Sequence, residues 1–372
     1  MVAEVIQRAG ALEETFADIE GDRWAVLGGE SSFSASGAGR ILARFLRSGA
    51  DLHVVQGPLL TTQTADQVIE ELRGADLDGI LAVGGGLVID TMKVVSLGIA
   101  TESTSRDLLE RAAEAPGEPL RTVAVPTTAG SGAERTPFAV LYVDGVKHSV
   151  DDPRLLPQTA IIDPLLMTSA PKPVAASAGL DALAHCVEST WACRSTPASQ
   201  ALASETLRVV VENIESAVSR GWTHAQESLA FASSTAGAAI AVTRTTAAHA
   251  LSYYLTSIHG VPHGHAVALT LGALIEANGA VDNSTVNDPR GVAHVRKATD
   301  IVCQGLGIAS SSEGHTFVSE LLGRLGLARS VNEATGRTVD RKEWIESVNP
   351  ERLANNPRLL DEPALLEIVD TA

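Results

Sequence analysis

The chain has 372 residues, and 45 acidic against 28 basic side chains give a net charge of −17 with histidine neutral. This length exceeds the size at which one hydrophobic core usually stops growing, so we expect two domains, and the acidic balance argues against a nucleic-acid partner. With only three cysteines, no signal-peptide pattern and no apolar run of membrane-spanning length, we expect a cytoplasmic protein that does not enter a membrane.

Residues 1–170 alternate short apolar runs with amphipathic segments, which is typical of βαβ units and a parallel sheet. We therefore predict an α/β domain here, with helices over 38–48 and 64–73. The predicted strands cover residues 24–27, 52–55, 79–83, 122–125 and 159–162.

Long Ala-rich segments with helical spacing replace the strands beyond residue 170. Prolines 164, 171 and 173 mark the boundary, because proline interrupts regular structure. We predict an all-helical domain over 171–372, whose first helices cover residues 174–191, 196–219, 224–244 and 245–258.

Two glycine-rich turns directly follow predicted strands, at 84–93 (GGGLVIDTMK) and 126–134 (PTTAGSGAE). Glycines let the backbone approach a ligand closely, and a helix N-terminus favours phosphate. The carboxyl ends of parallel strands share one edge of a sheet, so the two turns predict a nucleotide site, although neither matches G-x-G-x-x-G and each could serve only as a tight turn. The predicted cofactor-binding residues are Gly84, Gly85, Gly86, Asp90, Lys93, Thr127, Thr128 and Ser131.

A candidate metal site lies in the second domain. Asp181 and His185 are four positions apart in an apolar segment, so a helix would place both on one face, as it would an ordinary i, i+4 pair. Four of the ten histidines fall within 249–265; His249 lies in a helical stretch, and His263 lies in a turn where the chain can reverse. One carboxylate with imidazoles suits Fe(II) or Zn(II) better than Mg(II) or Ca(II).

With residues 161–164 (IIDP), 178–185 (AGLDALAH) and 356–358 (NPR), these motifs resemble the iron-containing (group III) alcohol dehydrogenases over nearly the whole chain. The resemblance implies a dinucleotide-binding domain at 1–170, a helical metal-binding and catalytic domain at 171–372, an active site in the cleft between them, and a homodimer. It also implies four metal ligands, which are Asp181, His185, His249 and His263.

Some positions depart from the family pattern. Leu87 stands where the glycine turn usually has Ser, and Tyr253 occupies the place of a second histidine often assigned to proton transfer. The proton donor is therefore open among Tyr253, His259 and His265.

The end of the first predicted strand bears on the choice between NADPH and NADH. Gly29 takes the position at which NAD-preferring members carry an Asp, which removes repulsion against a 2′-phosphate, and Ser31 and Ser32 could donate to that phosphate. The alignment thus favours NADPH, whereas Glu30 one residue later would favour NADH.

The substrate is the least constrained feature. Residues 244–271 are most similar to the branch of the family associated with phosphonate metabolism, whose members reduce phosphonoacetaldehyde to 2-hydroxyethylphosphonate. Binding of a dianionic phosphonate would need cationic side chains. Each cationic residue near these motifs could equally be a solvated surface group. The candidates are Arg135, Lys147, His148 and Arg244.

Other functions remain open. Residues 145–157 (GVKHSVDDPRLLP) also resemble maleylacetate reductases, although Asp181 stands where that branch tends to have Asn. A generic short-chain alcohol dehydrogenase, a sugar-phosphate cyclase of the dehydroquinate-synthase-like fold, and a non-catalytic nucleotide-binding or structural-metal protein are further alternatives.

Overall fold

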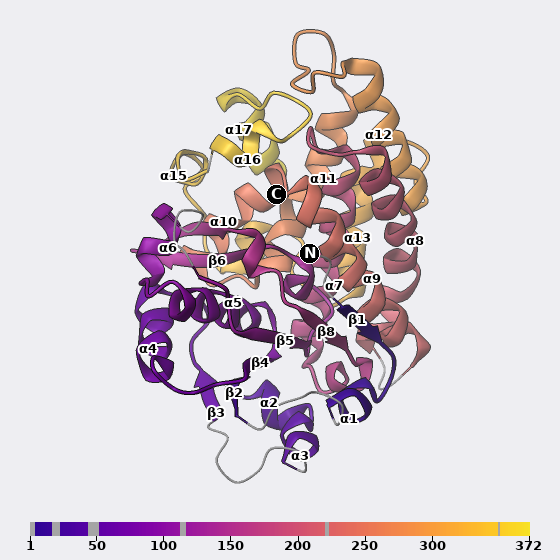
Figure 1. Ribbon diagram of the computed structural model, residues 1–372. Coiled ribbons are helices and arrows are strands. Elements are labelled where there is room, and N and C mark those ends of the chain that lie inside the picture. The colour runs from indigo at the N-terminus through magenta and orange to yellow at the C-terminus, as the bar shows by residue number, and fades with distance from the viewer. Residues whose placement is uncertain (1–3, 17–22, 44–51, 112–116, 220–222, 349) are drawn as a thin grey trace. The chain divides into compact units, whose positions relative to one another are not determined.

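The computed structural model describes residues 4–16, 23–43, 52–111, 117–219, 223–348 and 350–372 (Figure 1). The chain divides into two compact units, Met1–Ala170 and Pro171–Ala372, which are described separately. No helix among the described residues is long and apolar enough to cross a membrane.

The first unit contains a six-stranded sheet with the strand order β1-β8-β5-β4-β2-β3, and every neighbouring pair in it is parallel. The predicted α/β class with a parallel sheet is confirmed, and all five predicted strands form. Every residue of β4 and of β8 is buried, as expected for a parallel sheet that is covered on both faces. The strands are β1 (Glu4–Gln7), β2 (Trp24–Gly29), β3 (Leu52–Val55), β4 (Gly79–Gly84), β5 (Arg121–Pro126) and β8 (Thr159–Ile162).

Two hydrophobic cores flank this sheet because successive side chains of a strand point to opposite faces. Ala25 and Leu27 of β2 pack in one core with residues of α4 (Thr62–Leu72) and α5 (Gly86–Ala100). Trp24 and Val26 pack in the other with residues of α1 (Ala11–Phe16) and α3 (Ala38–Leu42).

Three features of the first unit differ from the prediction or extend it. Strand β1 and the antiparallel hairpin of β6 (Phe138–Val143) and β7 (Val146–Asp151) were not predicted from the sequence. The hairpin's turn is Asp144-Gly145 with φ values of 51° and 81°, and an Asp-Gly pair between two strand-like runs is a strong hairpin signal. The helix predicted over 38–48 is described only as α3, since residues 44–48 lie outside the described residues.

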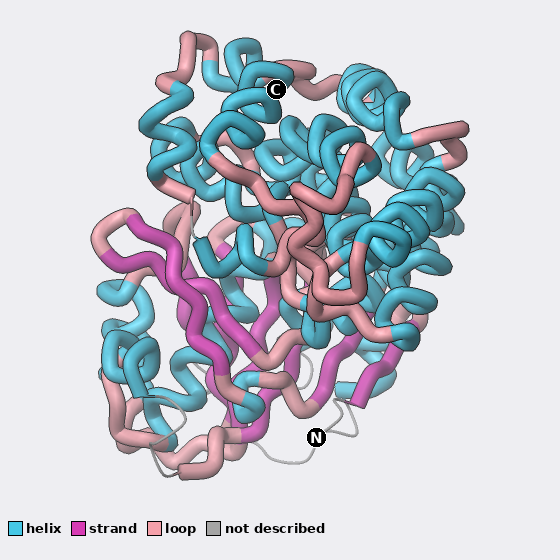
Figure 2. The backbone as a smooth tube through the Cα atoms, turned by 90° about the horizontal axis from the view of Figure 1, so that it is seen from above, coloured by secondary structure: helices cyan, strands magenta, loops and turns pink. Residues whose placement is uncertain are grey.

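The second unit is helical, as predicted. Figure 2 colours helices cyan and strands magenta. Its described residues form no strand, apart from an isolated bridge between Val286 and Arg358. A helix predicted to reach Arg244 ends at Thr243 instead. The longer helices are α7 (Lys172–Trp191), α8 (Pro197–Ser219), α9 (His224–Thr243), α10 (Ala247–His259), α11 (His263–Gly279), α12 (Val292–Leu306), α13 (Gly314–Arg324) and α17 (Glu362–Thr371). The short ones are α14 (Val331–Thr335), α15 (Arg341–Glu346) and α16 (Pro350–Ala354).

Candidate active site

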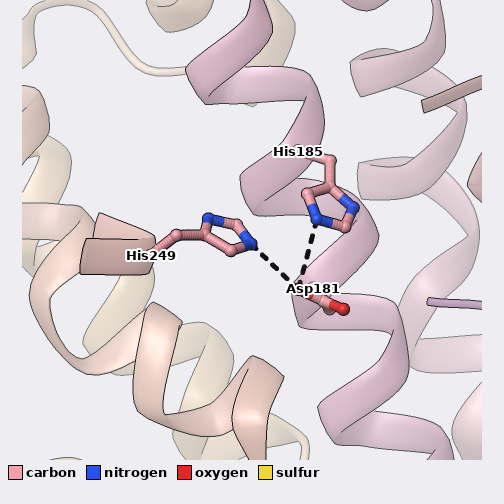
Figure 3. A group of neighbouring side chains, drawn as sticks. All are labelled: Asp181, His185 and His249. Carbon is pink, nitrogen blue, oxygen red and sulfur yellow. Dashed lines mark hydrogen bonds and ion pairs between the residues drawn. The ribbon is translucent and has the colours of Figure 1, made fainter. Parts of the chain in front are cut away.

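The residues predicted as metal ligands meet inside the second unit, at the junction of three helices. Helix α7 carries Asp181 and His185 one turn apart, α10 carries His249, and α11 begins at His263. Asp181 Oδ1 lies 3.6 Å from His185 Nε2 and 3.2 Å from His249 Nε2 (Figure 3). The same oxygen lies 3.9 Å from His263 Nε2. Three imidazoles thus face one carboxylate oxygen.

This arrangement fits a single divalent cation. Donor atoms about 2.1 Å from a tetrahedral metal are about 3.4 Å apart, which is close to the observed N–O distances. The donor atoms of Asp181, His185 and His249 all lie within 4.8 Å of one another, and these three residues are buried. The side chain of His263 is 33% exposed, so the cluster meets solvent at this member.

The cluster is electrostatically coupled. Burial alone would raise the pKa of Asp181, but the charges of His185, His263 and His249 and the hydrogen bond from His249 outweigh it and lower that pKa. Burial would lower the pKa of His249, yet the carboxylates of Glu188 and Asp181 outweigh it and raise the pKa to about 10. The group therefore holds an ionised carboxylate against positive charge, and a metal cation would replace protons there.

A glycine sets the approach of α11 to α7. A Cβ atom on Gly264 would collide with the carbonyl oxygen of Ser177 and lie 2.9 Å from Asp181 Cβ. The absence of a side chain at this position brings His263, the preceding residue, next to Asp181. The PHG sequence at 262–264 thus joins a ligand candidate to the small residue that its placement requires.

The two glycine turns of the first unit also lie together. Residues Gly84 to Gly86 connect β4 to α5, and the N–H of Thr127, directly after β5, donates to the carbonyl of Gly84 at 3.0 Å. A Cβ on Gly86 would come within 2.8 Å of Ser131 Oγ, and one on Gly85 within 3.4 Å of Thr128 Oγ1. Both turns therefore form one surface at the carboxyl edge of the sheet.

This surface suits the phosphates of a dinucleotide. Gly85 is the N-cap of α5 and no side chain caps the helix there, so the first N–H groups and the positive end of the dipole lie next to the glycines. Gly29 ends the neighbouring strand β2, and Ser31 follows as the N-cap of the short helix α2 (Ser32–Ala35). The predicted cofactor residues at positions 29, 31, 84–86, 127, 128 and 131 thus all lie at or just beyond the carboxyl ends of β2, β4 and β5.

Comparison with known proteins decides the family. The profile described as "Iron-containing alcohol dehydrogenase" matches residues 3–164, and that of the "Fe-containing alcohol dehydrogenase family, C-terminal" matches residues 175–372. The chain belongs to the iron-containing alcohol dehydrogenase family. It is therefore an oxidoreductase of the class that uses a nicotinamide cofactor and a metal.

Individual relatives agree with this assignment. The chain is 34% identical to a phosphonoacetaldehyde reductase of Streptomyces viridochromogenes, over 84% of this chain and 80% of that protein. An iron-containing alcohol dehydrogenase of Thermotoga maritima is 27% identical, with a TM-score of 0.83 over 99% of this chain and 97% of that one. A sulfoacetaldehyde reductase of Bifidobacterium kashiwanohense in complex with NAD+ shares the fold, with 24% identity and a TM-score of 0.85 over 99% of this chain and 96% of that one.

Glu188, which was not among the predicted site residues, contacts one of the candidate metal ligands. Glu188 on α7 is fully buried; its Oε1 accepts from Thr246 Oγ1 at 2.7 Å and from the N–H of Ala248 at 2.9 Å, and its Oε2 contacts His249 Nδ1. The sequence signal that could have identified Glu188 is its spacing from His185. Glu188 lies three positions after His185, on the same face of an otherwise apolar helix.

One of the three proton-donor candidates contacts a predicted ligand. The ring of Tyr253 stacks on that of His263, with centroids 6.2 Å apart and planes 20° apart. Ser252, which precedes it on α10, places its Oγ 3.4 Å from His263 Nδ1. Helix α10 therefore brings a hydroxyl and a phenol to the partly exposed member of the cluster.

The other two candidates have described contacts of a different kind. His259 Nδ1 accepts from Arg337 Nε at 3.1 Å, and burial and the Arg337 charge lower the pKa of His259. His265 Nε2 lies 2.8 Å from the carbonyl oxygen of Ala328, and burial lowers the pKa of His265. These contacts tie α10 and α11 to the C-terminal segment, and a proton-transfer role for either histidine stays a prediction.

Asp90 and Lys93, two of the predicted cofactor residues, are buried and bind each other and the protein backbone. Lys93 Nζ donates to Asp90 Oδ1, Thr136 Oγ1 and the carbonyl of Phe138 at 3.2, 2.9 and 2.8 Å. Asp90 Oδ2 accepts from the N–H of Val140 at 2.9 Å. This buried group fastens the β6–β7 hairpin to α5, and its predicted contact with the cofactor stays a prediction.

The predicted substrate cations come from three places. Arg135 closes a 3₁₀ turn, η2 (Ala133–Arg135), where burial lowers its pKa, while Lys147 and His148 lie in β7. Arg244 caps α9 with φ 60° and ψ 176°, so it belongs to the turn before α10 and not to the helix of His249. Three of these cations therefore belong to the first unit and one to the second.

Proposed function

We propose that the protein reduces a small aldehyde to its alcohol with NADPH, at a metal held by Asp181, His185, His249 and His263. The observation that carries this proposal is the convergence of three imidazole Nε2 atoms on Asp181 Oδ1 inside the helical unit. Fe(II) is the proposed ion, with Zn(II) as the alternative, because both accept nitrogen with carboxylate oxygen.

The metal, the cofactor and the chain's own residues would each have a separate role in the reaction. When bound, the metal polarises the carbonyl oxygen as a Lewis acid and the reduced nicotinamide supplies hydride to the carbonyl carbon. The N–H groups at the start of α5 would hold the cofactor phosphates. The phenol of Tyr253, stacked on His263, is the proposed donor of the proton that completes the alcohol.

For the substrate we propose phosphonoacetaldehyde, reduced to 2-hydroxyethylphosphonate. The 34% identity to a phosphonoacetaldehyde reductase over 84% of the chain supports this substrate class. Cations could recognise the phosphonate dianion through charge-assisted hydrogen bonds, with Arg giving bidentate contacts. The proposed cations are Arg135, Lys147, His148 and Arg244.

Steady-state rates of NADPH oxidation test the substrate. Phosphonoacetaldehyde should give a kcat/KM at least tenfold above that for acetaldehyde and for maleylacetate. A higher value for maleylacetate would favour the maleylacetate reductase alternative, and equal values for all three would favour a generic alcohol dehydrogenase. No oxidation with any aldehyde, with metal bound, would favour a non-redox cyclase or a non-catalytic role.

The cofactor preference is tested with the same assay. Gly29 ends β2 without a side chain that could repel a 2′-phosphate, so kcat/KM should be higher with NADPH than with NADH. Gly29→Asp should reverse that order. A wild-type preference of more than tenfold for NADH would refute the proposal and would point to Glu30 as the group that binds the ribose.

We also propose a cytoplasmic homodimer, following the family resemblance and the sparse cysteines. Light scattering during size-exclusion chromatography should give twice the chain mass of 38.7 kDa. A single-chain mass at micromolar concentration would refute the dimer.

A further inference from the structure

We propose that Glu188 is a positioning residue for the metal site: it holds His249 with a protonated Nδ1, so that Nε2 is free to bind the ion. This inference rests on the proposed function, because it assumes that His249 is a ligand. Glu188 itself would not touch the metal.

The contacts of Glu188 account for both carboxylate oxygens. Oε1 accepts from Thr246 Oγ1 and from the N–H of Ala248, and Oε2 contacts His249 Nδ1. Trp191 Nε1 donates to Thr246 Oγ1 at 3.1 Å, which directs the Thr246 hydrogen toward Glu188. The carboxylate is therefore fixed from both sides and cannot turn away from the imidazole.

An imidazole nitrogen that binds a cation carries no hydrogen, so when Nε2 of His249 holds the ion the ring hydrogen lies on Nδ1. Glu188 Oε2 is the acceptor placed against that nitrogen, and its other oxygen already accepts from Thr246 Oγ1 and from the N–H of Ala248. The opposite ring nitrogen, Nε2, faces Asp181 Oδ1 at 3.2 Å. A carboxylate behind a ligating imidazole sets its tautomer and raises its basicity.

The placement of Glu188 also joins two helices. It lies on α7 with Asp181 and His185, yet it accepts from residues in the first turn of α10, whose N-cap, Thr246, makes no side-chain cap of its own. A negative charge is favourable at a helix N-terminus. One helix thus supplies two of the ligands and the group that aligns the third.

Metal affinity separates this role from simple helix capping. The Zn(II) dissociation constant of the full chain, measured by competition with a chromophoric chelator, should rise by about 10- to 100-fold in Glu188→Gln. Glu188→Asp, which keeps the charge on a shorter side chain, should recover part of the loss. The matched control is Asp288→Asn, which removes another buried carboxylate of the same unit and should leave Zn(II) affinity unchanged.

A second measurement uses the wild-type protein and does not depend on the folding of a Glu188 variant. The ¹H–¹⁵N spectrum of the Zn(II)-loaded protein should show His249, identified by its loss in His249→Ala, with hydrogen on Nδ1 and none on Nε2. Hydrogen on Nε2, or unchanged Zn(II) affinity in a folded Glu188→Gln protein, would overturn the proposal. A wild-type protein that binds no Zn(II), Co(II) or Fe(II) would instead overturn the metal site, and the role of Glu188 with it.

Discussion

Gly86, the first residue of α5, lies against Ser131 of the second glycine turn: a Cβ on Gly86 would approach Ser131 Oγ to 2.8 Å and Ser131 Cβ to 3.1 Å. Contacts this short force a neighbour to move. The two turns, 45 positions apart by these numbers, are therefore packed closely against each other.

Gly86→Ala should displace Ser131 and raise the KM for NADPH by tenfold or more, with little change in bound metal. The added methyl should also lower the unfolding free energy by about 1–3 kcal/mol, as overpacking does. The double variant Gly86→Ala with Ser131→Gly removes both short contacts and should recover stability and part of the KM. If Gly86→Ala binds NADPH normally, the phosphates do not lie on this surface.

The four proposed ligands should not be equivalent. Asp181 Oδ1 is the atom that all three imidazoles face, whereas the His263 side chain is 33% exposed and lies farthest from it, at 3.9 Å. Asp181→Ala should therefore retain no stoichiometric metal after dialysis, while His263→Ala should retain some through three buried donors. Elemental analysis of the dialysed proteins measures this, and a reversed order would contradict the assignment.

The Asp288–Arg290 pair predicts a pH effect on stability. Arg290 donates to Asp288 Oδ1 at 2.8 Å and to the carbonyl oxygens of Ser195 and Ala192, so the pair ties the loop after α7 to residues near α12. Burial raises the pKa of Asp288, but the hydrogen bonds and charge of Arg290 outweigh it and lower the pKa below its ordinary value.

Because the folded-state pKa is lowered, this stabilisation is fully present above the unfolded pKa of about 3.9 and is lost as pH falls through the folded pKa. Asp288→Asn should therefore lower the unfolding free energy at pH 7 by about 1–3 kcal/mol. Urea titrations from pH 7 to pH 3 should show a smaller acid loss in the variant than in the wild type. Parallel curves for the two proteins would mean that Asp288 contributes nothing to acid sensitivity.

Sequence periodicity located much of this fold because its elements have a single strong pattern. The strand Gly79–Gly84 is apolar throughout, and α7 and α10 carry long apolar segments with helical spacing. β7 was missed because its exposed, alternating pattern (VKHSVD) lacks the apolar run of a buried strand, and β6 (FAVLYV), which has such a run, was not predicted either. The Asp144-Gly145 pair was the signal that could have placed the hairpin.

Part of the candidate site could likewise be predicted from local sequence spacing, and part could not. Helix spacing alone places Asp181 and His185 on one helix face, whereas the approach of His249 and His263 depends on how three helices pack, which no local pattern encodes. Glu188 looked like an ordinary helix residue, since its contacts with Thr246 and His249 cross more than 50 positions of sequence.

The backbone conformation and the charge of Arg244 can be tested separately, because the first affects stability and the second affects substrate binding. With φ 60° and ψ 176° it occupies a region that is essentially restricted to glycine, at a cost of about 1–3 kcal/mol. Arg244→Gly therefore removes the guanidinium without straining the turn, and the unfolding free energy should not fall. If the guanidinium binds the phosphonate, the KM for phosphonoacetaldehyde should rise about tenfold, since a charge-assisted hydrogen bond contributes about 1.5–3 kcal/mol.

Two controls isolate the charge of Arg244. The KM for acetaldehyde, which carries no anion, should be the same in Arg244→Gly and in the wild type. Glu102→Gly relieves another positive φ, of 54°, in the first unit and should leave both KM values unchanged. An equal rise in KM for both aldehydes would assign Arg244 to the shape of the turn before α10. No rise for either would leave phosphonate binding to Arg135, Lys147 and His148, because these are the remaining proposed cations.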